Sequence, residues 1–435
     1  MTSHRRVLYL ALTNDVGANR VVGAMANAGL DCAVLSPPGF YSARSGMISR
    51  HFPLPRQRGL WLAMLAVTGA LERTIADWAP DWIVPLDDMA SWQLRSLVVG
   101  RRASAALHRL IVRSLGSEHG YCAALSRTKL LDLAAASGVR VPQNIAVRDT
   151  SEAIQAATAI GYPLMFKLEH TCGGAGVFAI RNPAELKSAM TSVGLDGAPS
   201  LQRLRTAAKQ LVWSRANLVG LEQPAAAIQS RVEGRLAIHT VAAVEGRILD
   251  GVTFSAVAVH PEPAGASTVL RPIDHPEMAA AAVTLVSATE ISGFASFDFL
   301  IAPDNSATLI EMNARPVGSV HLGSRLGHDV CGAMAAHIKG HRLPPQNHDP
   351  MPDMEIALFP KELERDPYSP RLAAGSGCHH DIPWEDMPVI AAYLEGLAKL
   401  HPTRMAEIRA QLRQQPPTPT AKADTKSTRS KLVDA

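Results

Sequence analysis

Three side chains that favour a hard cation occur close together: Asp298, Glu311 and Asn313. They lie on two apolar runs joined by an Asp-Asn pair at 304–305, so the pattern predicts a β-hairpin over 297–315. Counting outward from the turn places Asp298 opposite Glu311, and strand alternation points Asn313 to the same face. Two carboxylates in apolar surroundings repel each other unless a cation or a proton intervenes. Such oxygen ligands suit Mg²⁺.

The two faces of this predicted hairpin differ in polarity. The face with the acids also carries Leu300 and Leu309, and these leucines favour a partly buried metal site. A hairpin with a solvated acidic face is the alternative, and a one-residue bulge would shift the register. The opposite face is expected to carry only apolar side chains, namely Phe297, Phe299, Ile301, Ile310 and Met312.

A second candidate site lies at 161–180, GYPLMFKLEHTCGGAGVFAI. The pattern predicts two short strands joined by a tip at 173–176, where backbone N–H groups can converge on an anion without obstruction by Cβ atoms. A tight turn is the alternative interpretation. Lys167 falls in the apolar strand before the tip, and a buried ammonium needs an anionic partner. Lys129 lies in the first turn of a predicted helix, where a cation opposes the helix dipole.

The composition is that of a globular protein with more than one folding unit, because the chain has 435 residues of which 47% are hydrophobic and 19% charged. Its five cysteines are scattered without a CxxC pair, which favours a reducing, cytoplasmic location. The amino-terminal apolar run VLYLAL is too short for a signal peptide, and the later apolar run at 59–71 is too short to span a bilayer. From residue 413 onward five basic residues face two acidic ones, so most of the net charge of +4 lies there. We therefore expect no nucleic-acid groove and a disordered tail.

The remaining pattern predicts an α/β protein. Segments 6–12, 18–30 and 31–35 read as a βαβ unit, and a strand at 81–86 runs into Asp87 and Asp88. These two acids are candidates for a ligand crevice at the strand ends or, alternatively, for a helix cap. In the last part of the chain, the run Cys378-His379-His380 is a weak metal candidate because no fourth ligand is evident.

The combined motifs resemble the ATP-grasp superfamily in order and spacing. These motifs are Lys129, the GYP-x3-K strand with its GGxG tip, and the Asp…Glu-x-Asn-x-Arg hairpin. Biotin carboxylase, carbamoyl phosphate synthetase and the D-alanine:D-alanine ligases carry similar runs. The resemblance implies an α/β ATP-grasp fold with an amino-terminal Rossmann-like pre-grasp domain and a small carboxy-terminal α+β extension. The expected boundaries are 1–115 for the pre-grasp domain, 116–345 for the ATP-grasp domain (lid about 129–228, base about 229–345), 346–412 for the extension and 413–435 for the disordered tail.

The resemblance also implies roles for individual residues. Lys129 and Lys167 would contact the α- and β-phosphates of ATP, and Arg315 would stabilise the transferring phosphoryl group or the acyl phosphate, so Lys167 and Arg315 are the catalytic candidates. The lid tip would close over the β- and γ-phosphates. Its members are Gly173, Gly174, Gly176 and Val177. The residues implied to hold one or two Mg²⁺ (or Mn²⁺) ions are Asp298, Glu311 and Asn313.

The segment from lid to base departs from the superfamily pattern. Ser230 and Arg235 stand where carboxylates near adenine and ribose are common. Gln229 and the backbone of Arg231 and Val232 are then the candidates for binding adenine.

The activity implied by the resemblance is ATP- and Mg-dependent ligation, in which a carboxylate is activated as an acyl phosphate and attacked by an amine or similar nucleophile. The alternatives are a biotin-carboxylase-like or kinase activity on the same fold, or an ATP-binding module without catalysis. The expected partners are a small-molecule carboxylate and amine, without nucleic acid or membrane. Dimers are common in the superfamily, so a homodimer is one option. His321, Arg271 and Ser319 are candidates for the acceptor pocket, each with a structural role as the alternative.

Overall fold

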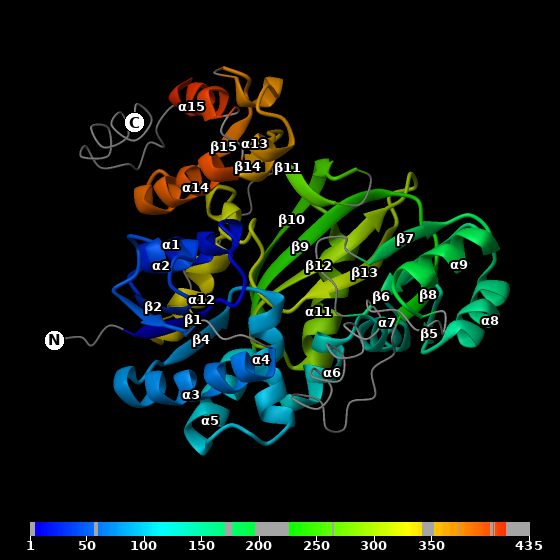
Figure 1. The fold of residues 1–435 in the computed structure, drawn as a ribbon, viewed down its shortest axis with the longest axis horizontal. Helices are drawn as coiled ribbons and strands as arrows, with labels where there is room; N and C mark the ends of the chain where they lie inside the picture. The colour runs from blue at the N-terminus through cyan, green and yellow to red at the C-terminus, as the bar shows by residue number, and fades with distance from the viewer. Residues whose placement is uncertain are drawn as a thin grey trace.

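The structure is a computed structural model whose described residues form three β-sheets (Figure 1). It describes residues 5–55, 60–169, 176–195, 226–262, 265–341, 352–373, 375–400, 403 and 405–414. No described helix is long and apolar enough to cross a membrane.

The amino-terminal unit is a parallel sheet in the order β3-β2-β1-β4. Val7 and Tyr9 on one face of β1 pack against α1, whereas Leu8 and Leu10 on the other face pack against α3, α4 and α5. The predicted βαβ unit is confirmed, because β1 pairs in parallel with β2. The elements are β1 (Arg6–Leu10), η1 (Gly17–Asn19), α1 (Arg20–Asn27), β2 (Asp31–Ser36), α2 (Tyr41–Arg44), β3 (Arg50–Pro53), α3 (Leu60–Trp78), β4 (Trp82–Pro85), α4 (Asp88–Val99) and α5 (Ala105–Leu115).

A second, antiparallel sheet in the order β5-β8-β6-β7 lies at the far side of the molecule from this unit (Figure 1). We call it the lid sheet. Helices α8 and α9 pack on it around Phe166 and Ile228. The predicted hairpin is present, because β6 pairs antiparallel with β7. Its elements, with the helices that lead to them, are η2 (Glu118–Gly120), α6 (Tyr121–Leu125), α7 (Arg127–Ala136), β5 (Asn144–Val147), α8 (Thr150–Ile160), β6 (Leu164–Leu168), β7 (Val177–Ile180), α9 (Pro183–Ser192) and β8 (Ala226–Ser230).

The third sheet, which we call the base sheet, has seven strands in the order β13-β12-β9-β10-β11-β14-β15. Phe297 and Phe299 on one face pack with α7 and α11, whereas Val252 and Phe254 on the other pack with α12 and the amino-terminal unit. Helix α12 therefore packs between the base sheet and the amino-terminal sheet. The elements are β9 (Arg235–Val244), β10 (Arg247–His260), β11 (Ala266–Pro272), α11 (Pro276–Thr289), β12 (Gly293–Ile301), β13 (Ala307–Asn313), η3 (Leu322–Arg325) and α12 (Val330–Lys339).

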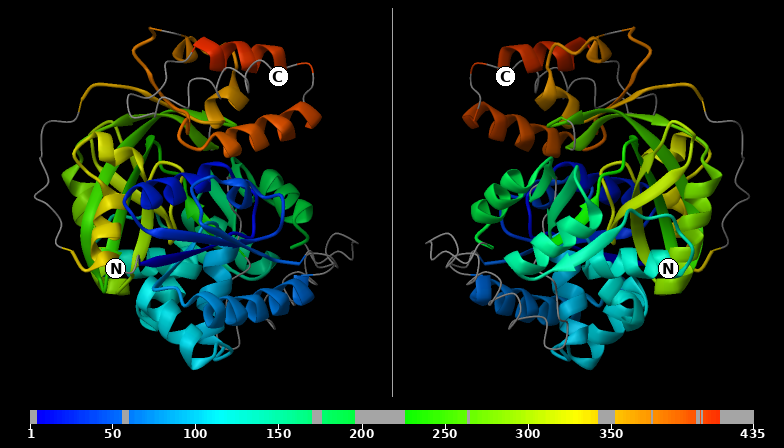
Figure 2. Two further views of the ribbon diagram at one scale, coloured as in Figure 1. Left: turned by 90° about the vertical axis from the view of Figure 1, so that its left-hand side faces the viewer. Right: turned by 90° about the vertical axis from the view of Figure 1, so that its right-hand side faces the viewer.

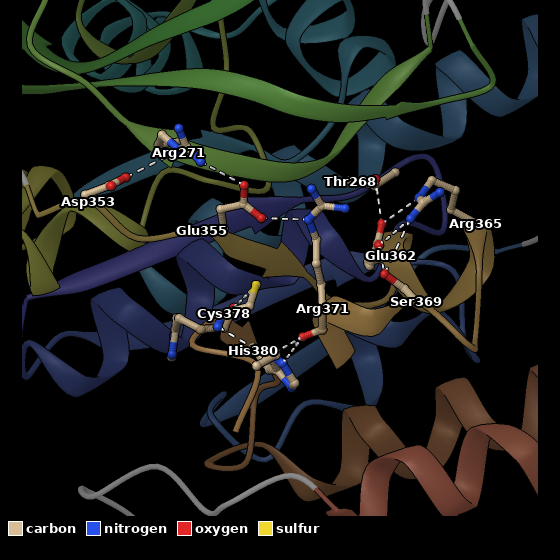
Figure 3. Close-up of polar contacts among 12 residues, drawn as sticks. Thr268, Arg271, Asp353, Glu355, Glu362, Arg365, Ser369, Arg371, Cys378 and His380 are labelled. Carbon is tan, nitrogen blue, oxygen red and sulfur yellow. Dashed lines mark hydrogen bonds and ion pairs between the residues drawn. The ribbon is translucent and has the colours of Figure 1, made fainter. Parts of the chain in front are cut away.

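The carboxy-terminal extension adds the last two strands of the base sheet and lies above the amino-terminal unit (Figure 2). Glu362 fixes it to β11, because this fully buried carboxylate accepts hydrogen bonds from Thr268 Oγ1 (2.8 Å), Ser369 Oγ (2.6 Å) and Arg365 (2.6 Å) (Figure 3). The elements are β14 (Ile356–Leu358), α13 (Lys361–Arg365), η4 (Pro370–Leu372), β15 (His379–Asp381), α14 (Met387–Leu400) and α15 (Met405–Gln414).

Candidate active site

The β12–β13 hairpin brings the two predicted carboxylates together. Asp298 pairs directly with Glu311 across the strands. Asn313 lies on the same face, because its Nδ2 donates a hydrogen bond to Asp298 Oδ2 (3.3 Å). The turn is where the sequence places it, with Asn305 at a φ of 66°. The predicted register at the acids is therefore present in the structure.

A β-bulge at Ile310 changes the register on the turn side of these acids. Phe299 pairs with Leu309 there, one residue away from the simple count. Because the extra residue reverses the alternation of β13, Leu309 joins the core with Phe299 and Ile310 is only partly buried. The predicted faces of Leu309 and Ile310 are thus wrong. The same bulge keeps Glu311 opposite Asp298.

The two carboxylates are electrostatically frustrated. Burial and the charge of Glu311 raise the pKa of Asp298 to about 7, although Arg315, Asn313 and Arg127 oppose the rise. A divalent cation would relieve this repulsion, and the two acids with the amide oxygen of Asn313 form a donor set that fits Mg²⁺ or Mn²⁺. Within the described ranges no group of three or more His, Cys, Asp or Glu side chains gathers as a metal site. This candidate set has two such side chains and an amide.

Arg127, for which the sequence pattern predicts no role, contacts the carboxylate of Glu311. Its Nη2 donates to Glu311 Oε1 (2.9 Å) and its Nη1 donates to the carbonyl of Leu168 (3.2 Å). Burial opposes its charge, but Glu311 and Glu169 outweigh burial and raise the pKa of Arg127. Lys129 is exposed and forms no ion pair within the described part of the chain. Two helical positions rotate a side chain by about 200°, so Arg127 and Lys129 face opposite ways.

Lys167 lies on β6, is buried, and has no ion pair among the described residues. Burial and the neighbouring Arg127 lower its pKa to about 8, while Glu311 and Asp298 oppose this change. A buried ammonium without a paired anion is costly, so the position favours an anionic ligand. Lys167, Arg127 and the two acids therefore form one group of charges.

Glu169 couples the lid sheet to helix α7. Its buried carboxylate accepts hydrogen bonds from the backbone N–H groups of Arg127 (3.1 Å) and Thr128 (3.1 Å), which begin that helix. A carboxylate at a helix amino terminus is favoured by the helix dipole. This contact fixes the direction in which Arg127 leaves the helix.

Arg315 is held by the amino-terminal unit. Its Nε and Nη2 donate to the two carboxylate oxygens of Asp88, at 2.6 and 2.7 Å, and its Nη2 also approaches Asn313 Oδ1 (3.4 Å). The alternative of a helix cap applies to Asp87, whose carboxylate accepts from Ala90 N (2.9 Å). Both acids follow β4, and the chain order reverses between β1 and β4, which is where parallel sheets form a ligand crevice.

The lid tip is described only in part. Gly173 and Gly174 lie outside the described residues. Gly176 has a φ of 76°, and its carbonyl accepts a hydrogen bond from Leu168 N (2.9 Å). Val177 pairs with Lys167 across the hairpin.

The segment proposed to bind adenine connects the lid sheet to the base sheet. Gln229 is buried on β8, and its Nε2 donates to Asn144 Oδ1 (3.3 Å). Arg231 is exposed and pairs with Glu233 at 3.6 Å, and Val232 is partly buried. The assignment of Gln229, Arg231 and Val232 to adenine stays a prediction.

Of the acceptor-pocket candidates, Arg271 lies apart from Ser319 and His321. Arg271 lies on β11, three strand positions from β12, and pairs with Glu355 (3.0 Å) in the carboxy-terminal extension (Figure 3). That contact supports its structural role. Ser319 is buried. His321 Nε2 lies 2.7 Å from Asp381 Oδ1, which also accepts from Arg20 Nη2 (2.6 Å).

The Cys-His-His run lies on and beside the edge strand β15. His380 Nε2 approaches the carbonyl of Arg371 (2.5 Å), and the Cys378 thiol lies 3.7 Å from the carbonyl of His379 (Figure 3). Burial lowers the pKa of His379 to about 4 and raises that of Cys378 to about 11. These contacts give the run local structural partners, and among the described residues no group of three metal-ligating side chains gathers around it.

Comparisons with known proteins show similarity in one family model and in the fold. Residues 127–201 match the family model of the ATP-binding domain of the carbamoyl-phosphate synthase L chain. No sequence among the curated proteins matches the chain.

Several solved structures share the fold. The biotin carboxylase domain dimer of the Hydrogenobacter thermophilus 2-oxoglutarate carboxylase, in complex with MgADP, ADP and bicarbonate, is 15% identical with a TM-score of 0.58, over 80% of this chain and 73% of that one. The Staphylococcus aureus N5-carboxyaminoimidazole synthetase complexed with ADP is 13% identical with a TM-score of 0.53, over 78% of each chain. The L-amino acid ligase from Bacillus licheniformis is 15% identical with a TM-score of 0.54, over 78% of this chain and 75% of that one.

The predicted resemblance to the ATP-grasp superfamily is thereby confirmed, and the α/β fold of this protein is the ATP-grasp fold.

Proposed function

We propose that the protein is an ATP- and Mg²⁺-dependent ligase that joins a small-molecule carboxylate to an amine or similar nucleophile. The observation that carries this proposal is the pairing of Asp298 with Glu311 beside two cations, the buried Lys167 and the partly buried Arg127. This arrangement provides a cation site next to positive side chains suited to phosphate oxygens. Solved structures with a similar fold contain ADP, and this supports ATP as the nucleotide.

In this proposal Asp298, Glu311 and Asn313 hold the metal ion. When bound, the ion neutralises charge on the β- and γ-phosphates. Lys167 contacts the phosphates from the lid sheet. Arg127 is a second candidate for the phosphate contact that the sequence assigns to Lys129, since it already lies beside Glu311.

The chemistry has two balanced steps. A carboxylate oxygen of the substrate bonds to the γ-phosphorus of ATP, and the bond from that phosphorus to ADP breaks. The amine nitrogen then bonds to the carbonyl carbon of the acyl phosphate, phosphate leaves, and the amine loses one proton. Arg315 stabilises the negative charge on the transferring phosphoryl group. The sequence assigns closure over the phosphates, which would limit hydrolysis of the acyl phosphate, to the glycine-rich run at 173–177, of which the structure describes only 176 and 177.

The test is a coupled ADP-release assay over a library of amino acids and other carboxylates, each offered with an amine and Mg²⁺. We expect ADP and phosphate with one class of acid. We expect Glu311→Ala to lower turnover by more than about 100-fold. Mutation of a residue that only hydrogen-bonds to a metal ligand already lowers metal affinity or activity by about 10- to 100-fold. Asp132→Ala, an exposed acid on α7, is the control. ATP binding without ADP formation across the library would reject the ligase in favour of a nucleotide-binding module.

A further inference from the structure

Arg95 is a buried cation without a carboxylate partner among the described residues. It lies on α4 with its side chain wholly removed from solvent. Its Nη1 donates to Ser91 Oγ (2.5 Å) and to the carbonyl of Ala314 (3.3 Å), and its guanidinium lies 5.4 Å from the ring centroid of Tyr121. Its Nε and Nη2 have no hydrogen-bond partner within the described part of the chain. Burial lowers the pKa of Arg95 to about 10.

Such a residue is unfavourable for folding. A buried donor without a partner costs free energy, and a buried charge costs more. Replacing a buried ionic group by an apolar side chain of similar volume is often neutral or stabilising. A role in stability alone therefore gives no reason for an arginine at this position. The contacts of the Arg95 guanidinium indicate another role.

Those contacts converge on the end of strand β13. Asp88, Ser91 and Arg95 lie at helical spacing along one face of α4. Asp88 binds the side chain of Arg315, whereas Ser91 Oγ (3.2 Å) and Arg95 Nη1 (3.3 Å) both donate to the carbonyl of Ala314. One face of α4 thus holds Ala314 and Arg315, two consecutive residues of the Glu-x-Asn-x-Arg run.

The fixed segment connects directly to the candidate metal ligands. Ala314 stands between Asn313 and Arg315. Arg315 Nη2 approaches Asn313 Oδ1 (3.4 Å), and Asn313 Nδ2 donates to Asp298 Oδ2 (3.3 Å). A shift of the Ala314 carbonyl would therefore move both neighbours relative to Asp298.

We propose that Arg95 is a positioning residue, which fixes the Ala314 carbonyl so that Asn313 and Arg315 are held toward Asp298. This inference rests on the proposed function, because it assigns Arg95 a role in the same site. Helix α4 of the amino-terminal unit would then hold the segment that carries Asn313 and Arg315.

The test measures Mn²⁺ binding by electron paramagnetic resonance, in the full chain with ADP, alongside thermal unfolding and ADP release. Arg95→Met removes the guanidinium at similar volume, and Arg95→Lys keeps a donor for the Ala314 carbonyl. Ser91→Ala removes the second bond to that carbonyl and leaves the buried charge in place. Leu94→Met, a neighbouring substitution on α4 that faces the core of the amino-terminal unit, is the matched control.

We expect Arg95→Met to weaken Mn²⁺ binding by about 10-fold or more, as loss of an outer partner of a metal site does, while its unfolding temperature stays level or rises. Arg95→Lys should retain more of the affinity than Arg95→Met, Ser91→Ala should weaken binding in the same direction, and Leu94→Met should bind as wild type. If Arg95→Met and Ser91→Ala bind Mn²⁺ as wild type does, the inference is overturned.

Failure of the proposed function gives a different pattern. If wild type binds Mn²⁺ with ADP but no acid releases ADP, the ligase proposal fails while the effect of Arg95→Met on Mn²⁺ still decides the inference. If wild type binds no Mn²⁺, the positioning role of Arg95 is rejected, because no metal site exists to be positioned.

Discussion

Asp298→Asn is expected to stabilise the metal-free protein in alkaline solution while abolishing its response to metal. The folded chain holds the pKa of Asp298 at about 7 through burial and the charge of Glu311. An unfolded chain leaves an aspartate near its usual value of about 3.9. The folded state therefore binds the proton more tightly than the unfolded state does. The stabilisation is complete below the unfolded pKa and is lost as the pH rises through the folded pKa.

The size of the effect follows from these two values. Between pH 5 and pH 8 the free energy of unfolding of metal-free wild type should fall by about 2.5 kcal/mol on account of Asp298 alone. The amide introduced by Asp298→Asn does not ionise, so this loss is absent from the variant. Titrating groups that do not interact with Asp298 contribute equally to the two proteins, so their contributions cancel when the difference between wild type and Asp298→Asn is compared at the two pH values.

The assay is urea unfolding at both pH values, with and without Mg²⁺ and ADP. Ligand should stabilise wild type more at pH 8 than at pH 5, because the metal competes with the proton on Asp298. The variant should gain little at either pH, and Asp132→Asn, an exposed acid on α7, should behave as wild type. If the difference in the free energy of unfolding between metal-free wild type and metal-free Asp298→Asn does not change with pH, the electrostatic argument is refuted.

Two further substitutions test other parts of the structure. Arg127→Met should weaken ATP binding by about 10-fold or more, because the charge-assisted bond to Glu311 and a phosphate-binding cation are lost together. Lys129→Met should weaken ATP binding less, and titration calorimetry measures both affinities. A larger loss of affinity in Lys129→Met than in Arg127→Met would return the phosphate role to Lys129. Glu362→Gln should lower the free energy of unfolding by about 2 kcal/mol or more in urea, because Arg365 loses its buried partner, with ADP release unchanged; equal stability would contradict the role of this buried carboxylate.

The local pattern was sufficient to predict the two hairpins that build the site. Asp304 and Asn305 mark a turn, apolar residues alternate on either side, and this is enough to place Asp298 opposite Glu311. The same reasoning predicted the pairing of β6 with β7 around Lys167. Their order along the chain carried the resemblance to the ATP-grasp superfamily. Such features depend on residues close together in sequence.

The bulge at Ile310 had no signal in the sequence. An extra residue in a strand is not marked by any residue type here, so Leu309 and Ile310 were predicted on the wrong faces. The error did not reach Glu311 because the count from the turn and the bulge cancel at that position. A correct register at one pair thus gave no assurance for the rest of the strand.

The sequence by itself determined which strands carry acids, glycines and lysine, because side-chain alternation and turn chemistry are local properties of the chain. Only the tertiary structure decided which distant charges meet them: Arg127 reaches Glu311 across 184 residues and Asp88 reaches Arg315 across 227. The physical reason is that a helix presents each residue in a different direction, and its rotation is set by packing against other elements, such as the contact of Glu169 with the start of α7.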